Sequence, residues 1–508
     1  MPPALAVAAA IGPLLVLLPI LATLADALGA GWSSVRALLF RSLVGELLVH
    51  TLLLMAACML AAGVLGLAWG WLVERTELPG RRLWAVLAAA PLAIPPFVAG
   101  YAWVSVASVF EGFLGAWLVV TLTYTPLVYL PVAAALRGLD PALEETAMAL
   151  GLGRWRVFLR VVLPQLRPAL LGGMLLVALD TLVEFGAFAL LRYRTFTTTI
   201  YAEYRTGFNG QAASVLAFVL LLLCLGCLAL EFAVRGRARY ARVGLGTRRR
   251  PERLRLGRWR VPALAVLAIP LAAGLVLPLA TVLYWTTQHA AAAVSPAAVG
   301  WGRLLAATWS SLSLACLGSG LTVLLALPLG YLAARRPGRL ATLLERAAFL
   351  AMGAPGIVVA LALGGLAVRH ARVFYQSTEL LLAAYAILFL PLAVVAVRAA
   401  LEQVQRALED VARSLGQGGW ALAWRVVLPL AGPGLGAAAA LVFVSVSTEL
   451  TATLLLAPIG TRTLATEIWA DTATLAFAAA APYAAVMTML SLFSTWLLAR
   501  RLLAAGAA

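Results

Sequence analysis

Long apolar segments alternate with short polar loops along most of the chain. An α-helix needs about 20 apolar residues to cross the hydrocarbon core of a bilayer. The pattern therefore predicts an all-α, polytopic membrane protein with about 12 transmembrane helices. The predicted spans lie near residues 4–25, 44–72, 83–109, 113–136, 169–191, 212–234, 261–286, 307–334, 347–368, 379–397, 434–457 and 479–499.

The composition agrees with this interpretation. Hydrophobic residues make up 63% of the 508-residue chain and charged residues 12%, and the mean hydropathy is +0.98. Soluble globular domains are only about 45–50% apolar. An ordinary soluble fold is therefore excluded.

One polar stretch between the spans occurs twice, at residues 140–168 and again at residues 408–433. Matching residues in the two copies are 265 positions apart, among them Glu144 and Glu409, Glu145 and Asp410, Ala147 and Ala412, Gly151 and Gly416, and Pro164 and Pro429. A second series, with an offset of 260, includes Arg75 and Arg335, and Pro95 and Pro355. The chain is thus a duplication.

The duplication divides the chain into a first transmembrane domain at 1–235, a basic linker at 236–260 and a second transmembrane domain at 261–508. Each half holds six predicted spans. An even number brings both halves into the membrane from the same side, so the two six-helix halves form a parallel repeat.

Each repeated stretch is predicted to form a short helix, a glycine break and a second short helix. Asp140 is expected to cap the first helix, and Glu144 and Glu145 lie near the positive end of its dipole. Gly151 and Gly416 permit a sharp change of direction. Each first helix is expected to carry one apolar stripe, formed by Leu143, Ala147 and Leu150 in the first copy and by Leu408, Ala412 and Leu415 in the second. Pro164 and Pro429 are expected to mark the return to an apolar span.

These two stretches resemble the cytoplasmic signature loop of binding-protein-dependent ABC importer permeases, which reads Glu-Ala-Ala, then Gly, then Leu-Pro. The spacing is the same in both copies: six residues from Glu145 or Asp410 to the glycine, and nineteen to the proline. Thr146, Val411 and Asp410 depart from the family pattern. The resemblance implies ATPase-coupling loops carried by Glu144, Glu145, Ala147, Gly151, Leu163, Pro164, Glu409, Asp410, Ala412, Gly416, Leu428 and Pro429.

The same resemblance implies the partners of the chain. These are two copies of a cytoplasmic ABC ATPase, seated against the two loops, and an extracytoplasmic substrate-binding protein. Within the family, the fused length and the segments 94–104 and 184–191 are most similar to ferric-iron permeases. Thiamine and aminoalkylphosphonate permeases are close alternatives.

A few residues within the spans are unusual for a membrane interior. Pro95 and Pro355 interrupt the third span of each half, which predicts a broken helix at a cavity wall or a packing kink. Asp180 and Glu184 are expected on one face of the fifth span, and Glu449 matches Glu184 at the 265 offset. Carboxylates at this depth are costly, so they are expected to line the translocation path or to bind neighbouring helices. Acidic rather than basic groups favour a cationic cargo.

The net charge of +17 is carried by arginine alone, because all 38 basic residues are Arg. With a cytoplasmic N-terminus, 29 of them fall on the cytoplasmic side, 11 of these within residues 235–260. This asymmetry predicts an inner-membrane protein with both termini and both repeated loops in the cytoplasm. It argues for contact with membrane lipid and against nucleic acid.

The absence of lysine rules out a P-loop and Schiff-base chemistry within this chain, so ATP must be bound by a partner. No cofactor is predicted and no catalytic residues are assigned. The three His residues lack metal-ligand spacing, and the CxxC pair Cys224 and Cys227 lies in an apolar span, where it is interpreted as small core residues rather than a metal or redox site. An enzyme is not expected. The less favoured alternative is a secondary transporter of the major-facilitator kind, also six plus six, whose intramembrane acids would carry protons.

Overall fold

The computed structural model describes residues 3–29, 31–236, 253–288 and 300–505. Over these ranges the chain is helical, and one isolated β-bridge joins Thr76 to Leu254. Within the described ranges, ten helices are long and apolar enough to cross a membrane, and two bent helix pairs bring the number to as many as twelve. The predicted all-α polytopic fold is confirmed. The chain forms two compact units, unit 1 (residues 1–41, 199–222 and 289–508) and unit 2 (residues 42–198 and 223–288).

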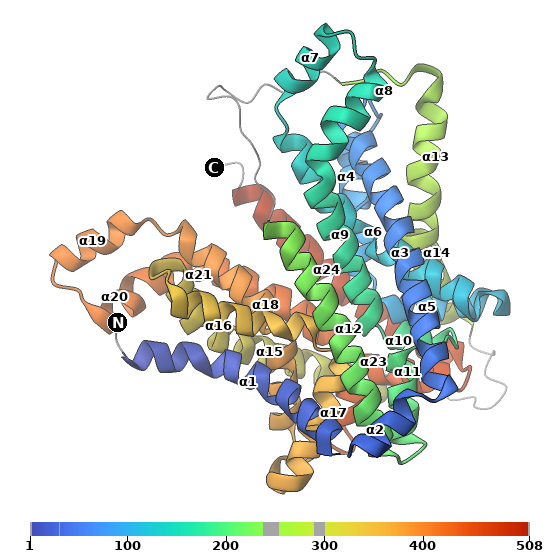
Figure 1. Ribbon diagram of the computed structural model, residues 1–508, viewed down its shortest axis with the longest axis vertical. Helices are drawn as coiled ribbons and strands as arrows, with labels where there is room; N and C mark the ends of the chain where they lie inside the picture. Colours follow the sequence, from blue (N-terminus) through green and yellow to red (C-terminus); the bar gives the residue numbers. More distant parts are fainter. Residues whose placement is uncertain (1–2, 30, 237–252, 289–299, 506–508) are drawn as a thin grey trace. The chain divides into compact units, whose positions relative to one another are not determined.

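Unit 2 is built around three long helices, α3 (Ser42–Arg75), α6 (Phe113–Gly138) and α9 (Leu163–Val183), which pack against one another (Figure 1). Glycine permits this close approach: a Cβ on Gly66 would lie 2.6 Å from Val128 Cβ. The unit also contains α4 (Arg81–Leu87), α5 (Pro96–Val106), α7 (Pro141–Ala149), α8 (Arg154–Val157), α10 (Gly186–Leu190), the later part of α12 (Gly210–Gly236), α13 (Arg260–Leu271) and α14 (Leu277–Thr287).

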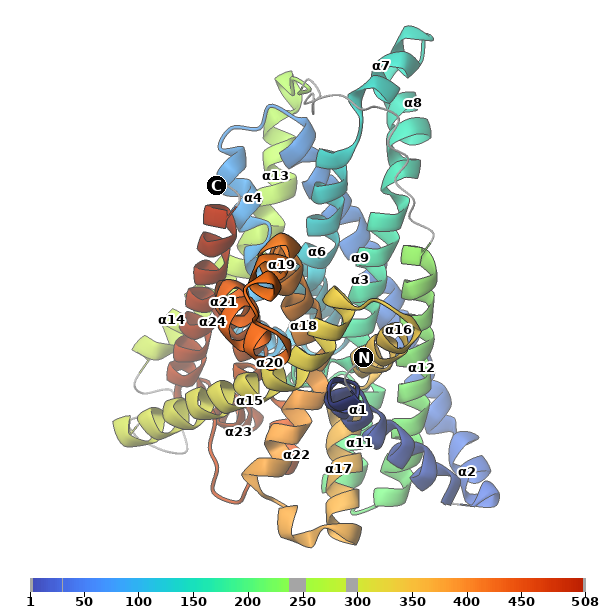
Figure 2. The ribbon, with the colours of Figure 1, turned by 90° about the vertical axis from the view of Figure 1, so that its left-hand side faces the viewer.

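Unit 1 repeats this arrangement with α15 (Trp301–Arg335), α18 (Thr378–Gln403) and α21 (Leu428–Ser447). Its α17 (Gly356–His370) packs against α22 (Thr451–Leu456), and the two helices lie side by side in Figure 2. The remaining helices of the unit are α1 (Pro3–Gly29), α2 (Trp32–Leu39), α11 (Phe196–Arg205), the first part of α12, α16 (Arg339–Phe349), α19 (Arg406–Ser414), α20 (Gly419–Leu422), α23 (Leu464–Ala473) and α24 (Phe477–Ala505).

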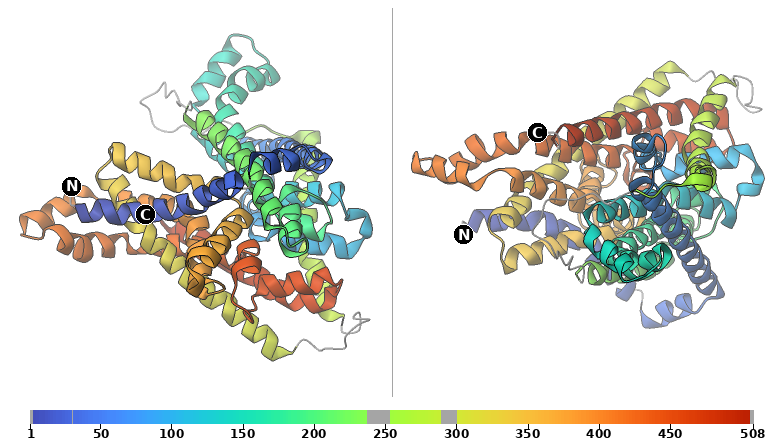
Figure 3. Two further views of the ribbon diagram at one scale, coloured as in Figure 1. Left: turned by 60° about the horizontal axis from the view of Figure 1, so that its bottom comes forward. Right: turned by 90° about the horizontal axis from the view of Figure 1, so that it is seen from above.

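The first span of each sequence half packs within the unit formed mainly by the other half. Helix α1, at the N-terminus in Figure 3, packs against α15, α16 and α17, and a bidentate ion pair joins Asp26 to Arg369, with Oδ1 2.6 Å from Nη1. Helices α13 and α14 pack in unit 2, where Trp69 Nε1 donates to Val266 O at 3.1 Å. Each unit is therefore composed of residues from both halves of the sequence.

The third span of each half is broken, as predicted. The segments Arg81–Ala93 and Pro96–Val106 meet at a bend of 89°, and Arg339–Gly353 and Gly356–His370 meet at 103°. Proline has no N–H group with which to continue the hydrogen-bond ladder, so the helix restarts after Pro95 and after Pro355.

Candidate functional site

The first repeated loop forms a helix that ends at a glycine. Asp140 caps α7, because its Oδ1 accepts the Ala142 N–H at 3.0 Å, and Pro141 occupies the first helical position. After α7 the chain reverses at Gly151, which has φ +84, and Leu152 N donates back to Ala147 O at 3.1 Å. This hydrogen bond closes the helix end in the manner of a glycine C-cap.

The second loop repeats this geometry. Gly416 has φ +81 after α19, and Gln417 N donates to Ala412 O at 2.9 Å. Ala147 and Ala412 are buried in their respective units. The two copies thus share a buried alanine and a left-handed glycine at matching positions.

The first acid of each loop is held by a buried arginine. In unit 2, Arg75 Nη2 lies 2.8 Å from Glu144 Oε1, and in unit 1, Arg335 Nε lies 2.6 Å from Glu409 Oε1. Side-chain exposure is 4% for Arg75, 7% for Arg335 and 3% for Glu409. Each arginine lies at the end of a long span, so the ion pair fixes the loop helix against that span.

The second acid of each loop faces outward. Glu145 is exposed, and Asp410 is exposed and paired with Arg413, whose Nη1 lies 2.6 Å from Asp410 Oδ1. The expected apolar stripe is not buried along its length, since Leu150 is 79% and Leu415 76% exposed. These apolar side chains, together with Met148 and Val411, leave an exposed surface on both loop helices.

The second short helix of each loop is not separate, which corrects the sequence prediction. Residues 154–183 and 423–447 form continuous helices, and the predicted span 169–191 begins earlier and ends at Val183. A π-helical turn precedes each proline: the Leu163 N–H reaches Phe158 O, and the Leu428 N–H reaches Ala423 O. The wider turn absorbs the missing N–H of Pro164 and Pro429, so neither proline breaks the helix.

Glu184 and Glu449 occupy equivalent breaks in the two units. Glu184 lies just beyond α9, in an extended conformation, and its Oε1 accepts the Ala187 N–H at 2.8 Å. Glu449 lies between α21 and α22, and its Oε1 accepts the Ala452 N–H, also at 2.8 Å. Glu184 is the C-cap of α9, one turn after Asp180, and its N–H donates to Asp180 O at 3.0 Å. Its side chain accepts a hydrogen bond from the first turn of the short helix that follows.

Each of these acids adjoins the broken third span of its own unit. A Cβ on Gly356 would lie 3.2 Å from Glu449 Oε1, and α17 packs against α22. In unit 2, α5 packs against α10, and Tyr124 Oη donates to Glu184 Oε2 at 3.1 Å. In both units a proline-restarted helix and a carboxylate thus lie next to one another.

Asp180 has no acidic equivalent in the second half. It lies in the last turn of α9, whereas the residue 265 positions later is Ser445, whose Oγ donates to Leu441 O. The duplicated part of this site is therefore the pair of glutamates.

Sequence reasoning missed two features of the loops. The sequence shows Arg75 and Arg335 as members of the 260-residue repeat but not as partners of the loop acids. The available signal is their matching place at the end of a span in both halves. The π-helical turns were also missed, and their signal is a Leu-Pro pair directly after them, at 163–164 and 428–429.

Comparison with known proteins agrees with these observations. A family model described as "Binding-protein-dependent transport system inner membrane component" matches residues 62–236 and again residues 326–502. The Fe(3+)-transport system permease protein FbpB 2 of Haemophilus influenzae is 35% identical over 488 residues, which cover 95% of each chain. The sulfate transport system permease protein CysT of Escherichia coli is 34% identical over 41% of this chain and 82% of its own. The molybdenum transport system permease protein ModB of Escherichia coli is 34% identical over 28% of this chain and 66% of its own.

Proposed function

The chain belongs to the family of binding-protein-dependent transport system inner membrane components, and on this premise we propose that it carries iron(III) across the inner membrane. It is a multi-pass permease subunit, and the two family matches in one chain leave no place for the major-facilitator alternative. The observation that supports iron(III) is the 35% identity over 95% of both chains to an Fe(3+)-transport permease.

Charge also favours a cation over an oxyanion. The sulfate and molybdenum permeases align with 41% and 28% of this chain. At the breaks, the chain has the carboxylates of Glu184 and Glu449, which repel sulfate and attract a hard metal ion. Thiamine is also a cation, so thiamine and aminoalkylphosphonate stay in the test as competitors.

The cargo is tested by uptake of radioactive iron into cells that express the permease with its binding protein and ATPase. We expect uptake that requires all three proteins and that excess thiamine, aminoalkylphosphonate or sulfate does not reduce. Iron uptake equal to that of cells lacking the permease, together with uptake of one competitor, would assign the competitor as cargo.

The two loop helices are proposed as the contacts for two ATPase subunits. Helices α7 and α19 present exposed apolar side chains at Leu150 and Leu415, and an exposed acid at Glu145 and Asp410. The Arg75 and Arg335 ion pairs give each helix a firm attachment to its span. When an ATPase subunit displaces α7 or α19, the attached membrane helix therefore moves with it. Leu163, Pro164, Leu428 and Pro429 continue that connection into α9 and α21.

The glutamate breaks are proposed to border the translocation path. Pro95 and Pro355 directly precede α5 and α17, which pack against the short helices α10 and α22 that follow Glu184 and Glu449. Broken helices within a membrane are found where backbone lines a cavity. Asp180, one turn before Glu184, adds a further carboxylate in the first half only.

The duplicated organisation is proposed to comprise domains at 1–235 and 261–508, joined by the basic linker 236–260, of which residues 237–252 lie outside the described ranges.

Both termini are proposed to be cytoplasmic. Cysteines at Arg154 and Arg372, in a chain without its native cysteines, should then react with an impermeant reagent from opposite faces. Labelling of both from the outside would refute the orientation.

A further inference from the structure

The end of the linker returns to the loop between α3 and α4. Leu254 N donates to Arg75 O at 2.9 Å, and Glu77 N donates to Leu254 O at 3.0 Å. These two hydrogen bonds are the isolated bridge between Thr76 and Leu254. They bring Arg253, which precedes the bridge, to the start of α4, where Arg81 and Arg82 lie.

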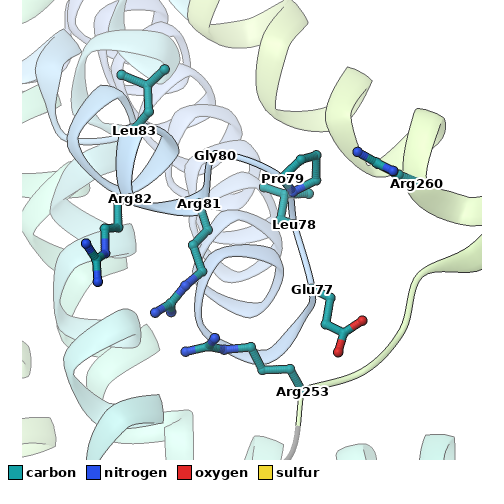
Figure 4. Close-up of a pocket in the computed structure, with 9 residues that line it drawn as sticks. All are labelled: Glu77, Leu78, Pro79, Gly80, Arg81, Arg82, Leu83, Arg253 and Arg260. Atoms are coloured by element: carbon teal, nitrogen blue, oxygen red, sulfur yellow. The ribbon is translucent and has the colours of Figure 1, made fainter.

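The result is an open pocket of about 680 Å³ with a basic lining. Among the described residues, four arginines from three segments line it, together with one acid, Glu77. In Figure 4 the guanidinium groups of Arg81 and Arg253 extend toward the same space, while the Glu77 carboxylate extends away from them. Glu77 Oε2 lies 3.9 Å from Nε of Arg255, outside the lining. The arginines of the lining are Arg81, Arg82, Arg253 and Arg260.

Exposed apolar side chains lie on the helices that carry these arginines. Leu83 belongs to the lining and is 61% exposed, and Val86 on α4 and Val261 on α13 are also exposed. Trp259 is exposed at the start of α13, beside Arg258. Exposed tryptophan with arginine next to apolar positions is typical of the membrane interface.

We propose that this pocket, formed by Arg81, Arg82, Arg253 and Arg260, binds the headgroup of an anionic phospholipid. The phosphodiester accepts hydrogen bonds from the guanidinium groups, which bind phosphate in a forked geometry. The acyl chains lie along Leu83, Val86 and Val261. Both α3 and α13 belong to candidate membrane spans, Ser42–Arg75 and Gly257–Thr287, so the pocket lies where a span meets the aqueous phase.

Occupancy of the pocket affects the first loop. Leu254 of the linker forms a hydrogen bond with the backbone of Arg75, and the side chain of Arg75 forms an ion pair with Glu144 of α7. Lipid that fixes Arg253 therefore supports the residue to which the loop helix is attached. At the 260 offset, Arg81 and Arg82 correspond to Ala341 and Thr342. The helix at this place in the second half, α16, begins with Arg339 and Leu340, whereas α4 begins with Arg81 and Arg82.

The test uses the full chain, purified and placed in nanodiscs of phosphatidylcholine alone or of phosphatidylcholine with phosphatidylglycerol. Native mass spectrometry measures retained phosphatidylglycerol, and thermal unfolding measures its stabilising effect. The variant is Arg81→Gln with Arg253→Gln. Its controls are Arg339→Gln, the first residue of α16 as Arg81 is the first residue of α4, and Arg81→Lys with Arg253→Lys, which keeps both charges.

We expect wild type, Arg339→Gln and the lysine variant to retain phosphatidylglycerol and to be stabilised by it. The glutamine variant should bind it roughly fivefold more weakly for each arginine removed, the factor that corresponds to about 1 kcal/mol per basic residue at an anionic surface. Equal retention by the glutamine variant, or an equal loss in Arg339→Gln, would overturn the site. Equal stabilisation by inorganic phosphate in phosphatidylcholine alone would assign the pocket to a soluble anion instead.

Discussion

The buried ion pair between Arg335 and Glu409 gives the sharpest test of how the loop helices are held. Glu409→Gln keeps the size of the side chain but removes its charge. The Arg335 guanidinium, 7% exposed, then keeps its bond to Val404 O at 2.9 Å and loses the carboxylate that lay 2.6 Å from its Nε. Arg413 also loses its contact with Glu409 but keeps Asp410.

Removing one partner of a buried pair costs about 3–5 kcal/mol, because the remaining charge stays desolvated without compensation. At about 1.4 kcal/mol for each factor of ten, this favours the detached loop by roughly two to three and a half orders of magnitude. The double variant Arg335→Gln with Glu409→Gln leaves two neutral amides and should recover more than half of the loss. Glu402→Gln, which removes an exposed pair with Arg398 at 2.8 Å, should change little.

Two measurements follow the loop. Binding-protein-stimulated ATPase activity in proteoliposomes reports coupling, and the rate of tryptic cleavage after Arg413 reports detachment of α19. Glu409→Gln should lower the first and raise the second. Wild-type values for both in Glu409→Gln, or a double variant worse than Glu409→Gln alone, would refute the reasoning.

Three further predictions follow from the same elements. Gly151→Val should uncouple ATP hydrolysis from uptake while the chain still inserts, because a β-branched residue at φ +84 strains the backbone by about 1–2 kcal/mol or more. Gly151→Asn should be milder, and we expect Gly416→Val to be less severe than Gly151→Val. Normal coupling in both valine variants would contradict this prediction. Glu184→Gln and Glu449→Gln should each reduce uptake at matched membrane abundance if the charge attracts cargo, whereas wild-type uptake in the combined Gln variant with damage in the Ala variants would show a purely structural role. Burial beside Glu467 raises the pKa of Asp471 on α23 to about 6, although Arg303 opposes the shift. The folded chain therefore binds this proton more tightly than the unfolded chain, and its stability falls as pH rises from about 4 to about 6. Asp471→Asn should melt higher than wild type at pH 7.5 but not at pH 4, and an equal difference in melting temperature at both pH values would refute the assignment.

The pattern of apolar segments was sufficient to predict the spans, because the length of a membrane helix is set by the bilayer and not by its neighbours. The broken third spans were equally predictable, since Pro95 and Pro355 carry the signal themselves. Asp140 and Gly151 likewise act through their own backbone.

Contacts between distant positions were not predictable in this way. Arg75 lies 69 residues before Glu144, and no local pattern shows that their side chains meet. The end of α9 differs from the prediction because the residues that follow Glu184, up to Leu191, are again apolar. Only the structure shows that α9 ends at Val183 and that a new helix begins at Gly186. The packing of α1 within unit 1 rests on contacts with α15, α16 and α17, which begin more than 270 positions after its end.

The packing of α1 has a consequence for the order of biosynthesis. Unit 2 is complete once residue 288 has been made, whereas unit 1 needs residues 1–41 together with segments as late as α24. Helix α1 is therefore made before the helices against which it packs, and Asp26 has no Arg369 to pair with until more than two thirds of the chain has been translated. A ribosome that stalls after residue 288 would leave a finished unit 2 and an orphaned first helix, the kind of intermediate that membrane proteases and insertases encounter.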